Sequence, residues 1–88
     1  MGRIEVGDIV KHFKREIHLK DGASFDSKYV YKILAFANHT ESKEKLVIYQ
    51  AMYFPFTVYA RPYDMFMGIV DKEKYPQIQQ KYRFEKID

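Results

Sequence analysis

The sequence predicts a mainly β fold, a small five-stranded barrel with a short tail packed on it. Between Leu46 and Val70 the chain carries seven aromatic residues but only two charged ones, Arg61 and Asp64, so this stretch must bury its surface or offer it to a partner. Short apolar segments alternate with turn-forming residues, which is typical of β-strands. Residues 29–38 are mostly apolar on both faces, as expected of a strand that bends and serves both halves of a barrel.

Length and composition limit how the chain is organised. Its 88 residues suffice for a single domain at 1–88, with a core at 6–70 and a tail at 71–88. The chain has no cysteine, which excludes disulfides, thiolate metal sites and cysteine nucleophiles, and favours a reducing compartment. The sequence has no apolar signal region and no segment long enough to span a bilayer, so we expect a cytoplasmic protein without a membrane partner.

The first half of the chain is expected to contain two strands joined by a loop. A short strand is expected at 9–13. Residues 15–28 are polar and contain Asp21-Gly22, a strong hairpin signal, so we expect a long loop or a small protruding hairpin there. Residues 29–38 are rich in β-branched and aromatic side chains and form the clearest strand. Alternation places the following residues of this strand on one face: Tyr29, Tyr31, Ile33, Ala35 and Ala37.

The aromatic half is expected to form three strands and one helical turn. Residues 45–53 should pair antiparallel with the preceding strand, because the connection between the two is short. Pro55 places a turn before a returning strand at 56–61, and residues 63–66 fit a single helical turn. A last short strand is expected to begin at 68–70.

The tail at 71–88 has a different pattern. Pro76 suits a first helical position, and Tyr75, Ile78 and Tyr82 recur at helical spacing, which predicts about two turns of helix. Residues 82–87 should then return as an extended segment. A helix this short does not persist alone, so we expect the tail to pack on the barrel and cover apolar surface.

Eight short words, spread over most of the chain outside residues 15–28, carry a resemblance to a known family: Gly7-Asp8-Ile9-Val10, His12-Phe13-Lys14, Ala37-Asn38-His39-Thr40-Glu41, Leu46-Val47-Ile48-Tyr49-Gln50, Met52-Tyr53, Arg61-Pro62, Met65-Phe66 and Arg83-Phe84. In order and spacing they resemble a small uncharacterised bacterial family, DUF1653, which is similar in fold to SH3-like barrels. The resemblance implies an SH3-like five-stranded barrel. It implies no activity, because the function of the family is unassigned.

Two loops of this chain depart from the pattern of that family. Arg15 stands where family members usually place a glycine after the His-Phe-Lys word, and the loop that follows is longer. Phe54-Pro55-Phe56 replaces a turn that usually contains glycine. Both differences fall in loops, so the expected barrel is unaffected while any binding surface built from those loops differs.

Tyrosines on neighbouring strands form the best candidate binding surface. Their rings and hydroxyls suit contacts with peptides, bases or cations at low ordering cost. The alternative is that they form a second hydrophobic cluster under the tail. Arg61 follows the same strand and suits either a carboxylate or phosphate ligand, or an internal pair with Glu41 or Glu44. The four tyrosines are Tyr49, Tyr53, Tyr59 and Tyr63.

A polar loop at 39–44 offers a second group of candidates. His39 and Glu41 place an imidazole that titrates near neutral pH close to a carboxylate, as a small enzyme would require. The same residues suit turn chemistry, in which side chains bond to neighbouring backbone. Catalysis would also require a nucleophile, and the few serines lie in loops, so we expect no catalytic residue. The histidines show no recognised ligand spacing, so we expect no metal and no cofactor.

The basic residues are spread rather than concentrated. The net charge is +3, and the one basic cluster consists of Lys11, His12, Lys14 and Arg15. A dedicated nucleic-acid binder usually shows a stronger basic stripe. The charges therefore permit nucleic acid without indicating it.

Together these observations favour a non-catalytic module that binds a peptide or protein through the aromatic residues and Arg61, beside the 39–44 loop. Weak binding of RNA or single-stranded nucleic acid through the basic cluster is the alternative, and an enzyme using His39 and Glu41 is the third hypothesis. The apolar faces of residues 29–38 suit coverage by the tail or by a second copy. The sequence does not choose between a monomer and a homodimer.

Overall fold

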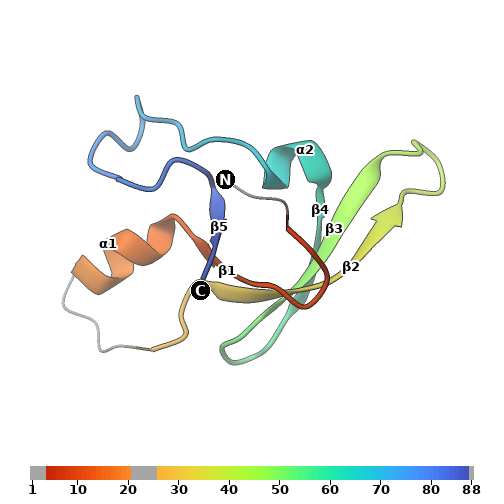
Figure 1. Cartoon of the computed structure of the whole chain (residues 1–88), viewed down its shortest axis with the longest axis horizontal. Helices are drawn as coiled ribbons and strands as arrows, with labels where there is room; N and C mark the ends of the chain where they lie inside the picture. Colours follow the sequence, from red (N-terminus) through yellow and green to blue (C-terminus); the bar gives the residue numbers. More distant parts are fainter. Residues whose placement is uncertain (1–3, 21–25, 88) are drawn as a thin grey trace.

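A computed structural model describes residues 4–20 and 26–87 of the chain. In this part the chain forms one five-stranded antiparallel sheet and two short helices (Figure 1). The elements in chain order are β1 (Ile9–His12), α1 (Lys14–Lys20), β2 (Val30–Asn38), β3 (Lys45–Ala51), β4 (Val58–Pro62), α2 (Tyr63–Phe66) and β5 (Phe84–Lys86). The strand order in the sheet is β4-β3-β2-β1-β5, so the first strand lies between the second and the last.

The mainly β fold is confirmed, but hydrogen bonds do not close the sheet into a barrel. Strands β4 and β5 are the two edges, and the described residues show no ladder between them. Side chains from the two edges meet instead, since the guanidinium carbon of Arg61 on β4 lies 5.7 Å from the ring centre of Phe84 on β5. The sheet is therefore curled, and we call the place where its edges face each other the seam.

The long β2–β3 hairpin forms as expected, with one irregularity. On β3 the alternation is regular, because Val47, Tyr49 and Ala51 are buried. On β2 the register shifts between Ile33 and Ala35, where a bulge inserts one extra residue. The expected single face of β2 is wrong for this reason. Tyr31 and Ile33 face the core before the bulge, and Phe36 packs against the same core after it.

Aromatic rings dominate the main core. Phe84 and Phe66 are fully buried and stack with their ring centres 4.0 Å apart. Phe84 also meets Tyr49 and Tyr31 edge to face, at 5.5 and 5.8 Å. This one side chain therefore joins β5 to β2, β3 and α2. A second, smaller cluster consists of Phe13, Val70 and Ile78.

Residues 14–20 form helix α1, so the expectation of a loop or hairpin throughout 15–28 is wrong. The expected turn at Asp21-Gly22 lies outside the described residues. Long-range contacts stabilise the helix. The buried guanidinium of Arg15 donates to the carbonyls of Lys28 and Asp26, at 2.6 and 2.7 Å. The carboxylate of Glu16 accepts the backbone N–H groups of residues 79 and 80, at 3.0 and 2.7 Å.

The tail also differs from expectation. Residues 68–70 form no strand apart from a single bridge between Ile69 and Tyr82, and the fifth strand is the predicted extended segment, which adds to β1 as β5. The expected helix near Pro76 does not form, because the segment is folded into turns. Side chains satisfy its backbone instead. The Lys72 ammonium donates to the carbonyls of residues 78 and 80, and the buried Gln80 amide donates to three further carbonyls.

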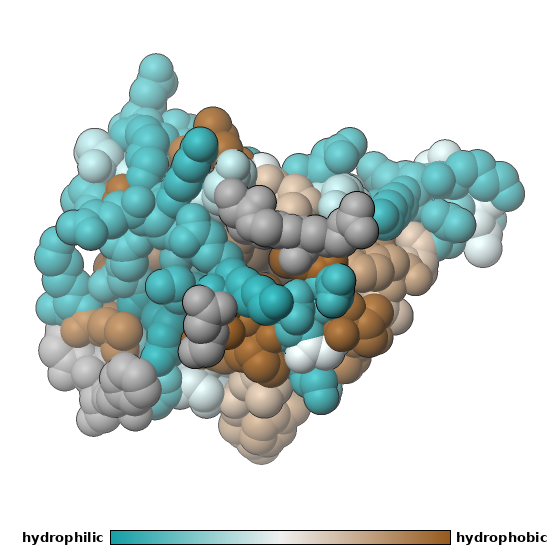
Figure 2. Space-filling view, viewed as in Figure 1, coloured by the Kyte–Doolittle hydropathy of each residue, from teal (hydrophilic) through white to brown (hydrophobic). Residues whose placement is uncertain are grey.

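The molecule has a polar side and an apolar corner. Figure 2 shows hydrophilic side chains over α1 and the 71–83 segment, and hydrophobic ones at the β3–β4 turn. Phe54 and Phe56 project from that turn and are 83% and 53% exposed. None of the described helices has the length and apolar character needed to cross a membrane.

The packing predicts that Phe84 supports the whole sheet. Replacing it with alanine removes the contacts among β5, β2, β3 and α2, so Phe84→Ala should lower the free energy of unfolding by about 3–5 kcal/mol, measured by urea denaturation. Ile69→Ala is the control, because Ile69 is 61% exposed and should change stability by less than about 0.5 kcal/mol. Equal stability of the two variants would contradict this role of Phe84.

Candidate functional site

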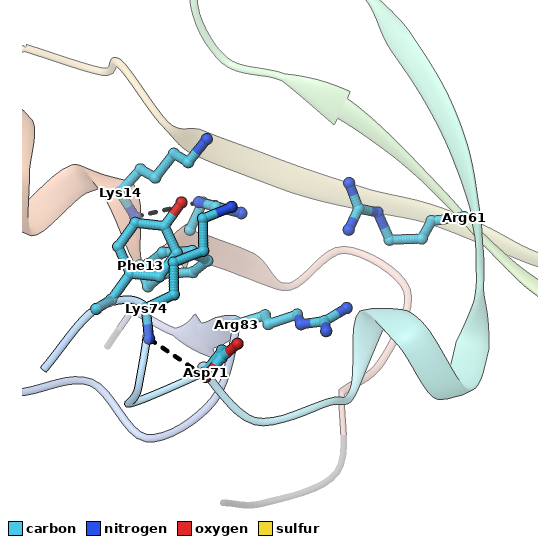
Figure 3. A pocket seen from close by; sticks show the side chains of 8 residues that line it. Phe13, Lys14, Arg61, Asp71, Lys74 and Arg83 are labelled. Atoms are coloured by element: carbon cyan, nitrogen blue, oxygen red, sulfur yellow. Dashed lines mark hydrogen bonds between the residues drawn. The ribbon is translucent and has the colours of Figure 1, made fainter. Parts of the chain in front are cut away.

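Two adjoining hollows lie along the seam. The larger, of about 330 Å³, is bordered by β1, the start of α1, β4 and the 71–83 segment (Figure 3). The smaller, of about 230 Å³, reaches across the tyrosines of β2, β3 and β4. They share His12, Lys14 and Arg61, so they form one continuous surface, which we call the seam groove. Its other lining residues are Phe13, Tyr29, Tyr31, Tyr49, Tyr59, Asp71, Lys74, Tyr75, Arg83 and Phe84.

The groove collects four cations from three parts of the fold. Lys14 begins α1, Arg61 lies on β4, and Lys74 and Arg83 belong to the 71–83 segment, which Arg83 ends directly before β5. No ion pair joins any of these four to a carboxylate in residues 4–20 and 26–87. Asp71 is the one acidic residue among the described lining residues, and its carboxylate accepts two backbone N–H groups. The groove therefore carries a net positive charge.

His12 lies at the centre of the groove as a neutral imidazole. Burial, together with the charges of Arg61, Lys14 and Arg83, lowers its pKa from 6.5 to about 4. Its Nδ1 atom accepts the backbone N–H of Lys14 at 3.1 Å, which places the ring proton on Nε2. The ring packs against Phe13 and Phe84, with centres 4.3 and 4.9 Å apart. The groove thus adds an uncharged donor to its four cations.

The tyrosines of the groove differ in accessibility. Tyr49 is 4% exposed, whereas Tyr59, which stacks on it with ring centres 5.5 Å apart, is 41% exposed. Tyr31 is buried, and its hydroxyl lies 2.9 Å from that of Tyr53. Burial, followed by this hydrogen bond, raises the pKa of the Tyr31 phenol, so it stays protonated. Tyr59 is therefore the ring that the groove presents most openly.

The structure divides the predicted aromatic surface into two places. Tyr49, Tyr59 and Arg61 lie in the seam groove, and Tyr53 contacts its buried floor through Tyr31. Tyr63 lies elsewhere, beneath the Lys45 ammonium, which is 4.2 Å from its ring centre. Lys45 directly follows the 39–44 loop, so Tyr63 lies near the end of that loop, whereas Tyr49 is five residues beyond Glu44 along β3.

The polar loop shows turn chemistry. The Nδ1 atom of His39 accepts the backbone N–H groups of Glu41 and Ser42, at 3.1 and 3.3 Å. The Glu41 carboxylate is hydrogen-bonded by the hydroxyl of its neighbour Thr40. His39 and Glu41 are exposed, and Arg61 forms no pair with Glu41 or Glu44 among the described ion pairs. Neither His39 nor Glu41 lines the seam groove.

The basic cluster is also divided. His12 and Lys14 line the groove, whereas Arg15 is buried and holds α1 to residues 26–28. Lys11 is absent from the described lining. In residues 4–20 and 26–87 no group of three metal-ligating side chains comes together.

Sequence analysis missed the contributions of Lys74, Arg83, Tyr29 and Tyr75 to the groove. Each forms part of a cation-aromatic pair of neighbours along the chain, as in Lys28-Tyr29, Lys74-Tyr75 and Arg83-Phe84. This recurring pair is the sequence signal by which they could have been found. A cation beside an aromatic ring suits a ligand with an anionic group and a planar group. The pairs alone do not show that they line one groove in the folded chain.

Comparison with known proteins identifies a family for this chain. The sequence profile of the family described as "Protein of unknown function (DUF1653)" matches residues 8–86. The chain belongs to this family, and the match includes every lining residue of the seam groove. Neither a curated protein nor a solved structure gives a match.

The lowered pKa of His12 predicts a pH dependence of stability. Between pH 6.5 and about 4 the unfolded chain takes up a proton that the folded chain does not, so stability is complete above pH 6.5 and falls as the pH decreases through this window. The loss should reach at most about 3 kcal/mol. NMR titration of the His12 ring and urea denaturation at pH 7 and 4.5 measure the two effects. In His12→Asn this contribution should disappear, and a His12 ring that titrates near 6.5 would contradict the lowered pKa.

Proposed function

We propose that this member of the DUF1653 family is a non-catalytic binding module that holds an anionic partner in the seam groove. The observation that carries the proposal is the set of four cations around a neutral histidine and an exposed tyrosine. None of the four forms an ion pair with a described carboxylate, and the Arg83 guanidinium donates to the carbonyl of Met65 at 3.2 Å. We regard the curled sheet as a partly open SH3-like barrel. In it, side chains rather than main-chain hydrogen bonds close the seam.

An anion is the ligand that best satisfies the charges of the groove. Cations held near one another repel, and that repulsion is relieved when a negative group lies between them. The Arg61 and Arg83 guanidinium groups have planar donors that suit carboxylate or phosphate oxygens. The neutral Nε2 donor of His12 adds a hydrogen bond without an additional charge.

A planar group beside that anion completes the fit. Tyr59 stacks on Tyr49, which is fixed in the core by Phe66 and Phe84, with ring centres 5.1 and 5.5 Å from its own. An exposed ring on so firm a support offers a stacking surface at little cost in conformational entropy. The preferred ligand therefore combines an acidic group with a ring.

The groove chemistry supports binding rather than catalysis. Its described lining has no serine, threonine or cysteine side chain that would serve as a nucleophile. Asp71 is engaged with backbone N–H groups, and Nδ1 of His12 accepts another. The one imidazole and the one carboxylate of the described groove lining therefore do not pair as a general acid and base. The peptide or protein partner expected from the sequence would need both acidic and aromatic side chains to offer the required acid and ring. A nucleic acid offers both.

Phenyl phosphate, which carries one ring and one phosphate, tests this proposal on the full chain. In ¹H–¹⁵N NMR titrations it should shift the amides of Lys14, Arg61, Lys74 and Arg83. Arg61→Ala should weaken binding by about tenfold, the effect of losing a charge-assisted hydrogen bond. Lys32→Ala is the matched control, since Lys32 is an exposed cation on β2 outside the groove lining. Equal weakening by both variants, or shifts confined to other surfaces, would exclude the groove.

The polar loop provides a test of location. The double variant His39→Asn with Glu41→Gln removes the ionisable side chains at the tip of the β2–β3 hairpin. Because neither residue lines the groove, binding of phenyl phosphate should stay within about twofold of the unmodified chain. Loss of binding in this variant, with an unchanged NMR spectrum elsewhere, would return the site to the loop.

A further inference from the structure

The seam groove continues beyond the residues considered so far. A third hollow, of about 190 Å³, is lined by Lys14, Ile17, His18 and Tyr29. It shares Lys14 and Tyr29 with the smaller hollow of the groove. The three hollows therefore form a series from the 71–83 segment, across β4, to α1, which we call the seam track. A track of this kind is longer than a single acidic group requires.

We infer that the anionic partner of the seam track is a single strand of nucleic acid. This inference rests on the proposed function of the groove and names its ligand class. A nucleic-acid strand carries one negative charge and one planar base in every repeat. The track offers a cation and an accessible ring at three successive places.

Cations and rings alternate along the track. At one end the Lys74 ammonium lies 5.5 Å from the ring centre of Tyr75, which is partly exposed. In the middle Arg61 follows Tyr59 on the same face of β4. At the other end Lys14 and Tyr29 line the third hollow together. The Lys28 ammonium lies outside that lining, 5.3 Å from the ring centre of Tyr29 and 4.8 Å from that of Tyr53. Proteins that bind single strands combine this arrangement of stacking rings with a positively charged groove.

Acidic groups near the track are already engaged. Asp71 accepts backbone N–H groups, as described above. At the α1 end, Asp26 lies 3.1 Å from His18 Nε2 and 3.9 Å from the Arg15 guanidinium. A phosphate entering the track would therefore meet more cationic than acidic side chains. This balance disfavours a basic peptide and favours a polyanion.

The rings favour a single strand over a duplex. A duplex presents its phosphates outward, but its bases are stacked on each other and have no free face. Tyr59 and the partly exposed Tyr29 and Tyr75 contact a planar group only when that group is unstacked. An acidic peptide would satisfy the cations, but it does not place a ring beside every acid. Acidic peptide is therefore the competitor against which the inference is tested.

Fluorescence anisotropy of the full chain with labelled mixed-sequence hexanucleotides, in RNA and DNA forms, tests the inference. Binding should weaken as salt rises, with a slope of log K against log salt of about −2 to −3, for three or four phosphate contacts. Tyr59→Ala should weaken binding about fivefold or more, and Tyr59→Phe should retain it, because stacking needs the ring and not the hydroxyl. Lys74→Ala should reduce the magnitude of the slope by about 0.7, and Lys32→Ala should leave both affinity and slope unchanged. A difference between the RNA and DNA forms would specify which nucleic acid is bound.

Three results would overturn the inference. They are a flat salt dependence, a duplex that binds as tightly as the single strand with no effect of Tyr59→Ala, and hexaglutamate that binds as tightly as the oligonucleotides. If phenyl phosphate still shifts the groove amides in these cases, the single-strand assignment fails while the proposed anion-binding function stands. If phenyl phosphate shifts none of them, both fail.

Discussion

The arrangement of this protein depends on the packing of Phe84 at the seam of the sheet. Its ring stacks on Phe66 and meets the edges of Tyr31 and Tyr49, so a strand of only three residues is held firmly to the core. This position brings Arg83, the preceding residue, into the lining of the groove, and the guanidinium carbon of Arg61 lies 5.7 Å from the Phe84 ring centre. Because rings rather than backbone bonds join the edges, a groove remains between them.

The electrostatics of the groove follow from that junction. Positive side chains from α1, β4, the 71–83 segment and the residue before β5 come together without ion-paired carboxylates among the described residues. A domain of this size has only a small margin of stability, so an uncompensated cluster of like charge is a cost in the free protein. His12 stays neutral for the same reason, because a further buried charge among these cations would increase the electrostatic repulsion. An anionic ligand bound in the groove would relieve this repulsion and so stabilise the folded protein.

The aromatic surface and the basic cluster were two separate hypotheses from the sequence, and the structure joins parts of both. Strand alternation correctly placed Tyr59 and Arg61 on one face, but it did not show which face of β3 is buried, and Tyr49 proves to lie on the buried one. It did not show that His12 and Lys14, about fifty residues earlier in the chain, lie against the same face. The turn chemistry of the 39–44 loop could be predicted from the sequence, because His39 bonds only to the backbone of residues two and three positions further along the chain.

The sequence by itself determined the strands β1 to β4, the antiparallel pairing of β2 with β3 and the helical turn α2, because these depend on local alternation and turn residues. It also determined the family, which short sequence words identify. Only the tertiary structure decided the rest. Helix α1 depends on Glu16, which binds backbone 63 and 64 residues away, and the bulge in β2 depends on its pairing with β3. The groove itself exists because Phe84 packs across the seam, and contacts between residues so distant in the chain leave no periodic pattern in the sequence.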